Sequence, residues 1–367
     1  MASSESGAKN VLINFRGGIG DFLILSPVLE SIRRDGRYSL SFVGNRSVRL
    51  LAEGGGYFRH ARFVDYESGA LRRLIGLIGT FFWLRGLGAD VCLTPVCSTG
   101  KASYRITEFS RADLRAGFEH EPTTGVYTHS IEVDPQQRDV DQNAKLLEVI
   151  GVEEAVGEPE LAVPESSSAK VDGYLSTQGA DPTAPIVAVA PFVKGMKGYS
   201  SRGWPLDRYI RLIDAILEER NVSVVLMGSR PELEKLHSLR ELPSSERLLL
   251  QDSSFSIYDA AALLKRCSLL VCNDGGVMHM AAAVNTPIVS IWGPTSPAAR
   301  GYLGRDNFIA IRKDNCDPCR EYKRPMINCT DQKCLYEIGV EEVLAACRRS
   351  LDRDSASFTS GASPSRF

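Results

Sequence analysis

The sequence contains no uninterrupted apolar stretch long enough to cross a bilayer, which argues against an integral membrane protein. The longest apolar run, residues 74–84, is shorter than the about 20 residues that a spanning helix needs. Residues 1–9 lack an apolar segment, so we expect no signal peptide and a cytoplasmic protein. Residues 74–84 have two interpretations: a buried helix, or, because Arg72, Arg73 and Arg85 flank them, a face resting peripherally on the inner surface of the membrane.

Net charge is also small, and two motifs of other nucleotide enzymes are missing. The 43 basic and 45 acidic residues give a formal net charge of −2, so we expect no nucleic-acid partner. The glycine spacing G-x-G-x-x-G of dinucleotide-binding enzymes does not occur. Asp139-Val-Asp141 has the spacing of a metal-binding motif but opens a predicted helix, so we interpret it as capping and solvated charge.

Nine cysteines in a chain without a predicted export signal indicate thiols or metal ligands rather than a disulfide framework. Five are isolated in apolar or helical contexts and resemble core residues: Cys92, Cys97, Cys267, Cys272 and Cys347. Four are clustered: Cys316, Cys319, Cys329 and Cys334. The first pair has metal-ligand spacing and the second is looser, so a structural zinc or iron site, reduced thiols and a disulfide that pins a loop all stay open.

The 367 residues exceed what one core usually serves and predict two domains. Apolar β-branched runs alternate with amphipathic segments, as in parallel sheets wound by helices. Pro- and Ser-rich residues 157–185 contain the expected boundary between a first domain, residues 1–165, and a second domain, residues 180–351. Residues 352–367 are Ser-rich and polar, and we expect them to be disordered.

Two glycine-rich segments follow predicted strands. Residues 16–21 (Arg-Gly-Gly-Ile-Gly-Asp) follow strand 11–15, and residues 274–279 (Asp-Gly-Gly-Val-Met-His) follow strand 269–272. Glycines let a ligand approach the backbone, and a helix start offers free N–H groups to a diphosphate. The plainer interpretations are a helix cap for Asp21 and a packed or solvated side chain for His279.

Two further loops also follow strands. Residues 292–297 (Trp-Gly-Pro-Thr-Ser-Pro) could present Thr295 to a ligand, or could be a rigid turn over a buried Trp. Residues 193–205 follow strand 186–191 and bring Lys194, Lys197 and Arg202 onto one glycine-rich loop. Three cations on one loop predict a diphosphate clamp rather than ordinary surface charge.

Together, in order and each at a strand end, these four segments resemble glycosyltransferase family 9, the ADP-heptose heptosyltransferases. The resemblance extends from Arg16 to Pro297. It implies an α/β protein of the GT-B fold, with two Rossmann-like domains whose parallel sheets face across a cleft. In this family resemblance, residues 1–165 are the acceptor domain and residues 180–351 the nucleotide-sugar donor domain.

The resemblance also implies roles for single residues. Asp21 matches the proposed general base, and Arg202 stands where the family has a phosphate-binding Lys. Gly275 replaces a Thr common in the family, which removes a hydroxyl contact to the donor. The donor-binding residues implied as a set are Gly18, Gly20, Lys197, Arg202, Ser229, Phe255, Asp274, Gly275, Gly276, His279 and Thr295.

The expected function is inverting transfer of a sugar, heptose from ADP-heptose, to a hydroxyl of lipopolysaccharide core or another glycoconjugate. Catalysis is expected to need no cofactor or metal, and the partners are the nucleotide sugar and a glycan or lipid-linked acceptor. The alternatives are a nucleotide-sugar epimerase or hydrolase, heptosyl transfer to a small molecule or protein, and a non-catalytic binder of nucleotide sugars. An epimerase would need further acid and base groups around the sugar, whereas a binder would not need Asp21.

Overall fold

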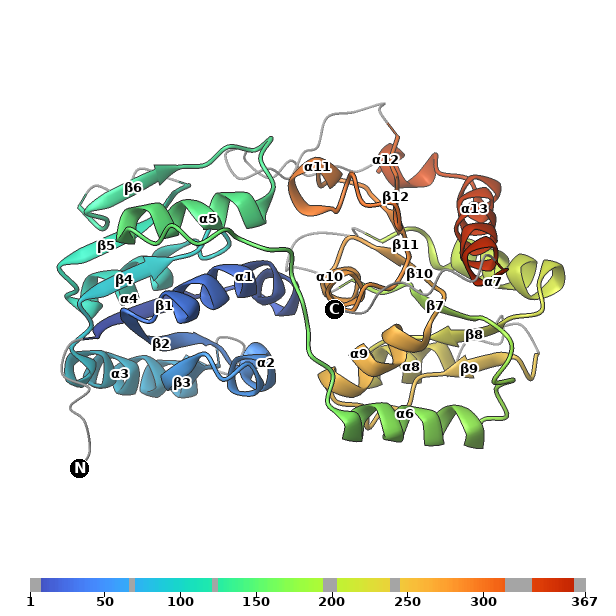
Figure 1. Cartoon of the computed structure of the whole chain (residues 1–367), viewed down its shortest axis with the longest axis horizontal. Coiled ribbons are helices and arrows are strands. Elements are labelled where there is room, and N and C mark those ends of the chain that lie inside the picture. The colour runs from blue at the N-terminus through green and yellow to red at the C-terminus, as the bar shows by residue number, and fades with distance from the viewer. Residues whose placement is uncertain are drawn as a thin grey trace. The chain divides into compact units, whose positions relative to one another are not determined.

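The computed structural model describes residues 8–65, 70–120, 125–193, 203–237, 245–313 and 332–359. The chain divides into two compact units, residues 1–160 and residues 161–367. Each unit contains one six-stranded sheet in which every strand pair is parallel (Figure 1). Parallel sheets covered by helices on both faces produce the nearly continuous apolar strands that the sequence contains.

In unit 1 the sheet order is β3-β2-β1-β4-β5-β6. Helices α1 and α5 pack against each other, whereas α3 and α4 form the other pair. The elements are β1 (Lys9–Phe15), α1 (Ile19–Asp35), β2 (Tyr38–Asn45), the 3-10 turn η1 (Arg46–Val48), α2 (Arg49–Gly54), β3 (Phe58–Val64), α3 (Ala70–Leu87), β4 (Val91–Thr94), α4 (Lys101–Ser110), β5 (Leu114–Glu119), β6 (His129–Glu132) and α5 (Asp139–Ile150).

Unit 2 repeats this topology, with the order β12-β11-β10-β7-β8-β9. Helices α7 and α13 pack together, as do α9 with α6 and α10. The elements are α6 (Glu165–Thr177), β7 (Ile186–Ala190), α7 (Leu206–Glu219), β8 (Ser223–Leu226), α8 (Arg230–His237), β9 (Leu248–Leu250), α9 (Ile257–Arg266), β10 (Leu269–Asn273), α10 (Gly276–Ala283), β11 (Ile288–Ile291), α11 (Pro297–Arg300), β12 (Phe308–Ile311), α12 (Lys333–Tyr336) and α13 (Val340–Thr359).

Both sheets reverse their strand order at one point, between β1 and β4 in unit 1 and between β7 and β10 in unit 2. Ligands of open α/β sheets bind outside the carboxyl ends of the strands at such a switch point. The glycine-rich loops after β1 and β10 therefore lie at the two switch points, where ligands of such sheets bind.

The apolar runs identified the central strands, but weaker elements escaped the sequence patterns. Strands β5, β6 and β12 and helix α4 were not predicted. Strands β5 and β6 carry polar side chains, and β6 is an exposed edge strand, so neither produces an apolar run in the sequence. Helix α6 lies inside the Pro- and Ser-rich segment and belongs to unit 2. Ion pairs Lys170–Asp259 and Asp172–Arg266 attach it to α9.

The last helix is longer than the sequence pattern indicated. Helix α13 continues through Asp352 to Thr359, where a disordered tail was expected. No Pro or Gly interrupts it before Gly361, and Asp352 forms an ion pair with Arg220 at 2.7 Å. Residues 360–367 lie outside the described part of the chain.

None of the helices in the described ranges combines the length and the apolar content needed to cross a membrane. Four of the five isolated cysteines are buried as expected, namely Cys92, Cys267, Cys272 and Cys347, whereas Cys97 is half-buried. Burial raises the pKa of Cys92 to about 11 and that of Cys267 to about 12. These thiols therefore stay protonated at neutral pH and act as core side chains.

Candidate active site

The β1–α1 loop of unit 1 is built for a close turn. A Cβ on Gly17 would lie 2.5 Å from the Cβ of Asp21 and 2.7 Å from the Phe15 ring, so only glycine fits there. Behind it, the backbone N–H of Arg16 donates to Ser98 Oγ at 2.9 Å, and its guanidinium donates to the carbonyl of Thr99 at 3.1 Å. The loops after β1 and β4 are thereby joined at the switch point of unit 1.

Asp21 lies in the first turn of α1 and is half-buried. Its Oδ2 accepts the backbone N–H of Gly18 at 2.8 Å, which forms one arm of a capping box. Within the described ranges no hydrogen-bond donor to Oδ1 is found. The plainer interpretation of Asp21 as a helix cap is therefore correct, and it leaves one carboxylate oxygen for chemistry.

In unit 2 the predicted donor residues follow the carboxyl ends of four different strands. Ser229 follows β8, Phe255 follows β9, Asp274 and its glycines follow β10, and Thr295 follows β11. Because the strands are parallel, these loops lie at one edge of the sheet. Lys197 and Arg202, on the loop after β7, lie outside the described residues.

The second and third motifs meet in a buried hydrogen bond. Thr295 donates through Oγ1 to Asp274 Oδ2 at 2.8 Å, and both side chains are almost inaccessible to solvent. Thr295 therefore orients Asp274, a contact that the sequence did not indicate. Trp292, at the start of the same loop, is fully buried, as expected if the loop is a turn over a buried Trp. Burial and the neighbouring Asp274 carboxylate raise the pKa of the Cys272 thiol, which keeps it protonated.

Helix α10 begins directly beside this carboxylate. Gly275 is its N-cap in extended backbone, and Gly276 is its first residue. A Cβ on Gly275 would lie 3.5 Å from Val193 Cγ1, an ordinary contact that leaves room for a side chain. The free N–H groups of this first turn and the helix dipole form an arrangement that attracts anions.

His279 lies one turn into α10 and is buried. Its Nδ1 is 2.9 Å from the hydroxyl of Tyr302, and the two rings meet edge to face at 5.7 Å between centroids. If the hydroxyl donates to Nδ1, the proton of the imidazole is on Nε2. Tyr302, which fixes the ring, lies 23 residues away in sequence and was missed, because no local pattern links the two positions.

Ser229 and Phe255 have partners of their own. The backbone N–H and the hydroxyl of Ser229 both donate to Glu232 Oε2, at 2.7 and 2.6 Å. The ring of Phe255 meets Tyr174 of α6 edge to face at 5.2 Å, and the Lys170 ammonium lies 5.1 Å from its centroid. Phe255 is thus held between the β9–α9 loop and α6, at the same sheet edge as Asp274.

Asn273, which sequence reasoning missed, joins this edge to the loop after β7. It ends β10 and is buried. Its Oδ1 accepts the backbone N–H of Trp204, and its Nδ2 donates to the carbonyl of Pro191, both at 2.9 Å. These partners are the two ends of the loop that carries Lys197 and Arg202. A single amide therefore fixes both ends of the predicted diphosphate clamp.

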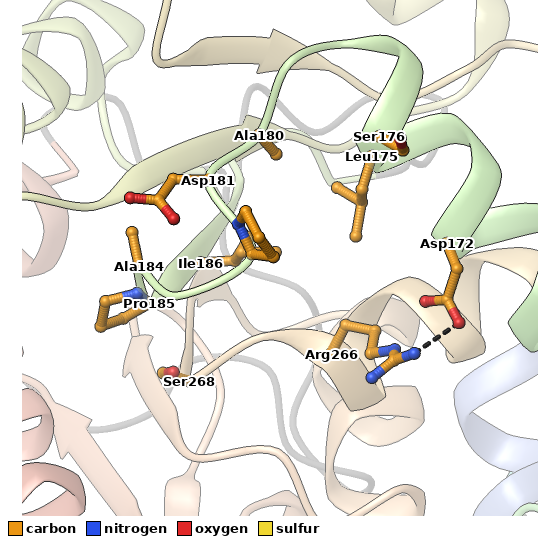
Figure 2. Close-up of a pocket in the computed structure, with 11 residues that line it drawn as sticks. Asp172, Leu175, Ser176, Ala180, Asp181, Ala184, Pro185, Ile186, Arg266 and Ser268 are labelled. Atoms are coloured by element: carbon orange, nitrogen blue, oxygen red, sulfur yellow. Dashed lines mark hydrogen bonds and ion pairs between the residues drawn. The ribbon is translucent and has the colours of Figure 1, made fainter.

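A cavity of about 410 Å³ lies away from these residues, at the amino ends of β7 and β10 (Figure 2). Ile186 and Ser268 line it, and the Asp172–Arg266 ion pair borders one side. Ligands of parallel sheets bind at the carboxyl ends of the strands, so this cavity is at the wrong edge for the donor.

Of the four clustered cysteines, only Cys334 falls within the described residues. It is buried in α12 among the apolar side chains of unit 2. In the described ranges, no group of three or more His, Cys, Asp or Glu side chains is placed to bind a metal ion together. Cys316, Cys319 and Cys329 lie outside those ranges.

Curated relatives match part of this chain. Lipopolysaccharide heptosyltransferase 2 of Escherichia coli (strain K12) is 27% identical over 194 residues, which are 49% of this chain and 53% of that protein. The chain spans about half the length of the curated relatives it matches.

Solved structures cover nearly the whole chain. The structure of E. coli ADP-heptose lps heptosyltransferase II has a TM-score of 0.72 at 18% identity, covering 95% of this chain and 99% of that one. Iron-containing dodecameric heptosyltransferase TibC from enterotoxigenic E. coli, in complex with ADP-D-beta-D-heptose, has a TM-score of 0.52 at 12% identity, covering 97% of this chain and 80% of that one. With the two parallel six-stranded sheets, these similarities confirm the expected GT-B fold.

The family model described as glycosyltransferase family 9 (heptosyltransferase) matches residues 102–329. This stretch begins in α4 of unit 1 and includes the donor-side loops of unit 2 from β7 to β11. Because the match covers more than half of the sequence, the chain belongs to glycosyltransferase family 9.

Proposed function

We propose that this protein is an inverting glycosyltransferase that moves heptose from ADP-heptose to a hydroxyl of lipopolysaccharide core or another glycoconjugate. The observation that carries the proposal is the buried Asp274–Thr295 pair beside the glycine-opened start of α10 at a switch point, in a chain of family 9. The similarity to a lipopolysaccharide heptosyltransferase of E. coli supports heptose and this acceptor class.

In this mechanism Asp21 is the general base. Its Oδ1 takes the proton of the acceptor hydroxyl as that oxygen forms a bond to the anomeric carbon of the donor. The bond between the anomeric carbon and the diphosphate oxygen breaks on the opposite face, which inverts the configuration. The Gly18 N–H on Oδ2 holds the carboxylate in one orientation during this step.

The leaving diphosphate receives the electron pair of the broken bond and is stabilised by unit 2. The free N–H groups at the start of α10 offer hydrogen bonds to its oxygens, and Lys197 and Arg202 supply positive charge. These groups perform the neutralisation that a divalent metal performs in other transferases, so we propose metal-independent catalysis. Asp141 of the Asp-x-Asp spacing is paired with Arg138 at 2.8 Å, which supports its structural role.

A panel of nucleotide sugars tests the donor. The full chain is incubated with each nucleotide sugar and a delipidated core glycan, and released nucleotide and glycan mass are measured with and without EDTA. ADP release coupled to addition of one heptose, unchanged by EDTA, is expected. Isomerisation of the donor without transfer would favour an epimerase, and ADP release without a glycan product would favour a hydrolase.

The acceptor is proposed to be glycan or lipid-linked, with the reaction on the cytoplasmic side of the membrane. Comparing the core glycan with small-molecule and protein acceptors in the same assay separates the alternatives. Transfer to a free sugar at a rate equal to that for the core glycan would contradict the proposed acceptor class.

Arg202→Ala should weaken ADP binding by about 1.5–3 kcal/mol, the scale of a charge-assisted hydrogen bond to phosphate. Arg202 stands just before Gly203 and Trp204, whose backbone is fixed by Asn273. Arg211→Ala is the matched control, because Arg211 is an exposed α7 arginine paired with Asp207. Titration calorimetry that gives equal ADP affinities for both variants would remove Arg202 from the site.

Gly275→Thr should fold normally and bind the donor about two- to tenfold more tightly. The φ of −177° suits any residue, a Cβ meets only ordinary contacts, and Thr is as good an N-cap as Gly. The added hydroxyl can donate one hydrogen bond to the donor, worth about 0.5–1.5 kcal/mol. Gly275→Ala adds the Cβ without the hydroxyl and should leave affinity near that of the wild type; an equal gain in both variants would assign the effect to packing.

We also propose that the four clustered cysteines bind a structural zinc or iron ion. The similarity to TibC, an iron-containing heptosyltransferase, supports it, and buried Cys334 suits a structural thiolate ligand. Elemental analysis of protein purified without a metal-affinity tag should give about one zinc or iron per chain. Cys316→Ser should lose the metal, whereas Cys97→Ser, outside the cluster, should keep it; metal-free wild-type protein with normal melting would end the proposal.

A further inference from the structure

Helix α3 presents a row of large apolar side chains to solvent. Ile75, Ile78 and Phe82 follow each other at helical spacing on one face and are 62%, 50% and 68% exposed. On the other face Thr80 and Leu84 are 1% exposed. The apolar run of the sequence is therefore neither a fully buried helix nor a spanning one, because it divides into a packed face and an uncovered face.

The row continues onto α4. Phe109 is 41% exposed, and its ring meets that of Phe81 edge to face at 5.0 Å. Phe81 in turn contacts Phe82 at 5.5 Å. We call Ile75, Ile78, Phe82 and Phe109 the α3–α4 patch. A contiguous apolar surface of this kind on a folded protein usually marks a binding surface.

The charges around the patch are almost all positive. Arg85 is exposed one turn beyond Phe82, with its guanidinium 5.2 Å from the centroid of the Phe81 ring. On α4, Lys101 and Arg105 are exposed at successive turns that lead to Phe109. Among the described side chains of the two helices and the C-cap of α4, the cations are Arg85, Lys101, Arg105 and Arg111, against the single acid Glu108. The chain as a whole carries a net charge of −2, so this basic surface is local.

We propose that the α3–α4 patch docks on an anionic lipid bilayer. Apolar side chains flanked by Arg and Lys are the composition of surfaces that lie in the interface of a membrane, with the rings among the acyl chains and the cations at the headgroups. A second copy of this chain fits less well, because a two-fold interface would bring the same basic residues against each other.

This inference rests on the proposed function and deepens it. If the acceptor is lipid-linked, its sugar is presented at a membrane surface, and docking through α3 and α4 attaches unit 1 to that surface. Because the patch is in unit 1, the docking step needs no residue of the donor edge of unit 2.

Vesicle sedimentation tests the proposal. The full chain is mixed with vesicles of phosphatidylcholine or of phosphatidylcholine with about one quarter phosphatidylglycerol, and the bound fraction is measured over a range of salt. Binding to the anionic vesicles that falls with rising salt is expected, with little binding to the neutral ones. Ile78→Asn/Phe82→Asn and Arg85→Glu/Arg105→Glu should each reduce anionic vesicle binding at least tenfold.

Leu303→Asn is the matched control, because Leu303 is a 50% exposed apolar residue of unit 2, and this variant should bind as the wild type does. ADP affinity and melting temperature of the patch variants should equal those of the wild type, which excludes misfolding. Wild-type protein that stays in the supernatant, or patch variants that pellet normally, would overturn the proposal. Concentration-dependent dimerisation lost in the Asn variant, without vesicle binding, would overturn it in favour of self-association. If the wild-type protein does not bind vesicles but still transfers heptose to delipidated glycan, the docking proposal is wrong and the proposed function stands. If it binds vesicles but does not transfer heptose, only the proposed function is contradicted.

Discussion

Asp21→Asn is expected to lower turnover by about 10²–10⁴-fold, the usual contribution of a general base. The asparagine Oδ1 can still accept the Gly18 N–H that Asp21 accepts at 2.8 Å, so the start of α1 should keep this capping hydrogen bond. ADP affinity should stay within about twofold, because the base contacts the acceptor hydroxyl and not the nucleotide. Turnover is measured by transfer to delipidated glycan and ADP affinity by calorimetry.

The capping role makes a matched control necessary. Asp141 is also the third residue of a helix in unit 1, half-buried and paired with Arg138 at 2.8 Å, so Asp141→Asn removes the same charge from the equivalent position of α5. It should leave turnover unchanged. Asp21→Ala removes cap and base together and should add a stability loss of about 1 kcal/mol to the same turnover loss. If Asp21→Asn keeps more than about a tenth of wild-type turnover, Asp21 is a cap only.

Sequence reasoning succeeded where a local pattern has a single physical cause. The apolar runs at β1, β7, β10 and β11 can be satisfied only between helix layers, and the glycines after β1 and β10 stand where the chain must turn sharply into a helix. Ser256 and Asp259 have the spacing of a capping box, and the structure contains both of its hydrogen bonds at the start of α9.

The contacts that orient the site could not be predicted in the same way. Thr295 and Asp274 are 21 residues apart, and Tyr302 and His279 are 23 apart. Such pairs arise from the order of strands in the sheet, which no local spacing encodes. The motif at residues 139–141 shows the same limit, since Asp139 is buried rather than solvated, whereas Asp141 is half-buried and paired with Arg138.

Asn273 is the residue that sequence reasoning was least able to find. Its neighbour Asp274 belongs to a recognisable motif, but an asparagine at the end of a strand has no pattern of its own. Its partners, Pro191 and Trp204, are 82 and 69 residues away. Both hydrogen bonds exist only because β7 and β10 are neighbours at the switch point.

Asn273→Ala should therefore reduce both the stability of unit 2 and its affinity for ADP. The substitution leaves the Trp204 N–H and the Pro191 carbonyl buried without these partners, at a cost of about 1–3 kcal/mol for each group. With its two ends no longer joined, the loop carrying Lys197 and Arg202 samples more conformations, and ordering it on the diphosphate takes free energy from binding. We expect ADP affinity to fall at least tenfold at temperatures where the variant is fully folded.

Asn14→Ala separates positioning from loss of stability. Asn14 is an equally buried asparagine on β1, whose Nδ2 donates to the Ser103 carbonyl at 2.8 Å and to Thr107 Oγ1 at 2.9 Å. Its loss should lower the melting temperature of unit 1 while ADP affinity stays at the wild-type value. The dependence of ADP affinity on salt gives a second readout, because a loop that no longer holds its cations near the diphosphate should flatten that dependence in Asn273→Ala. ADP affinity within twofold of the wild type, with an unchanged salt dependence, would show that Asn273 stabilises the fold without positioning the loop.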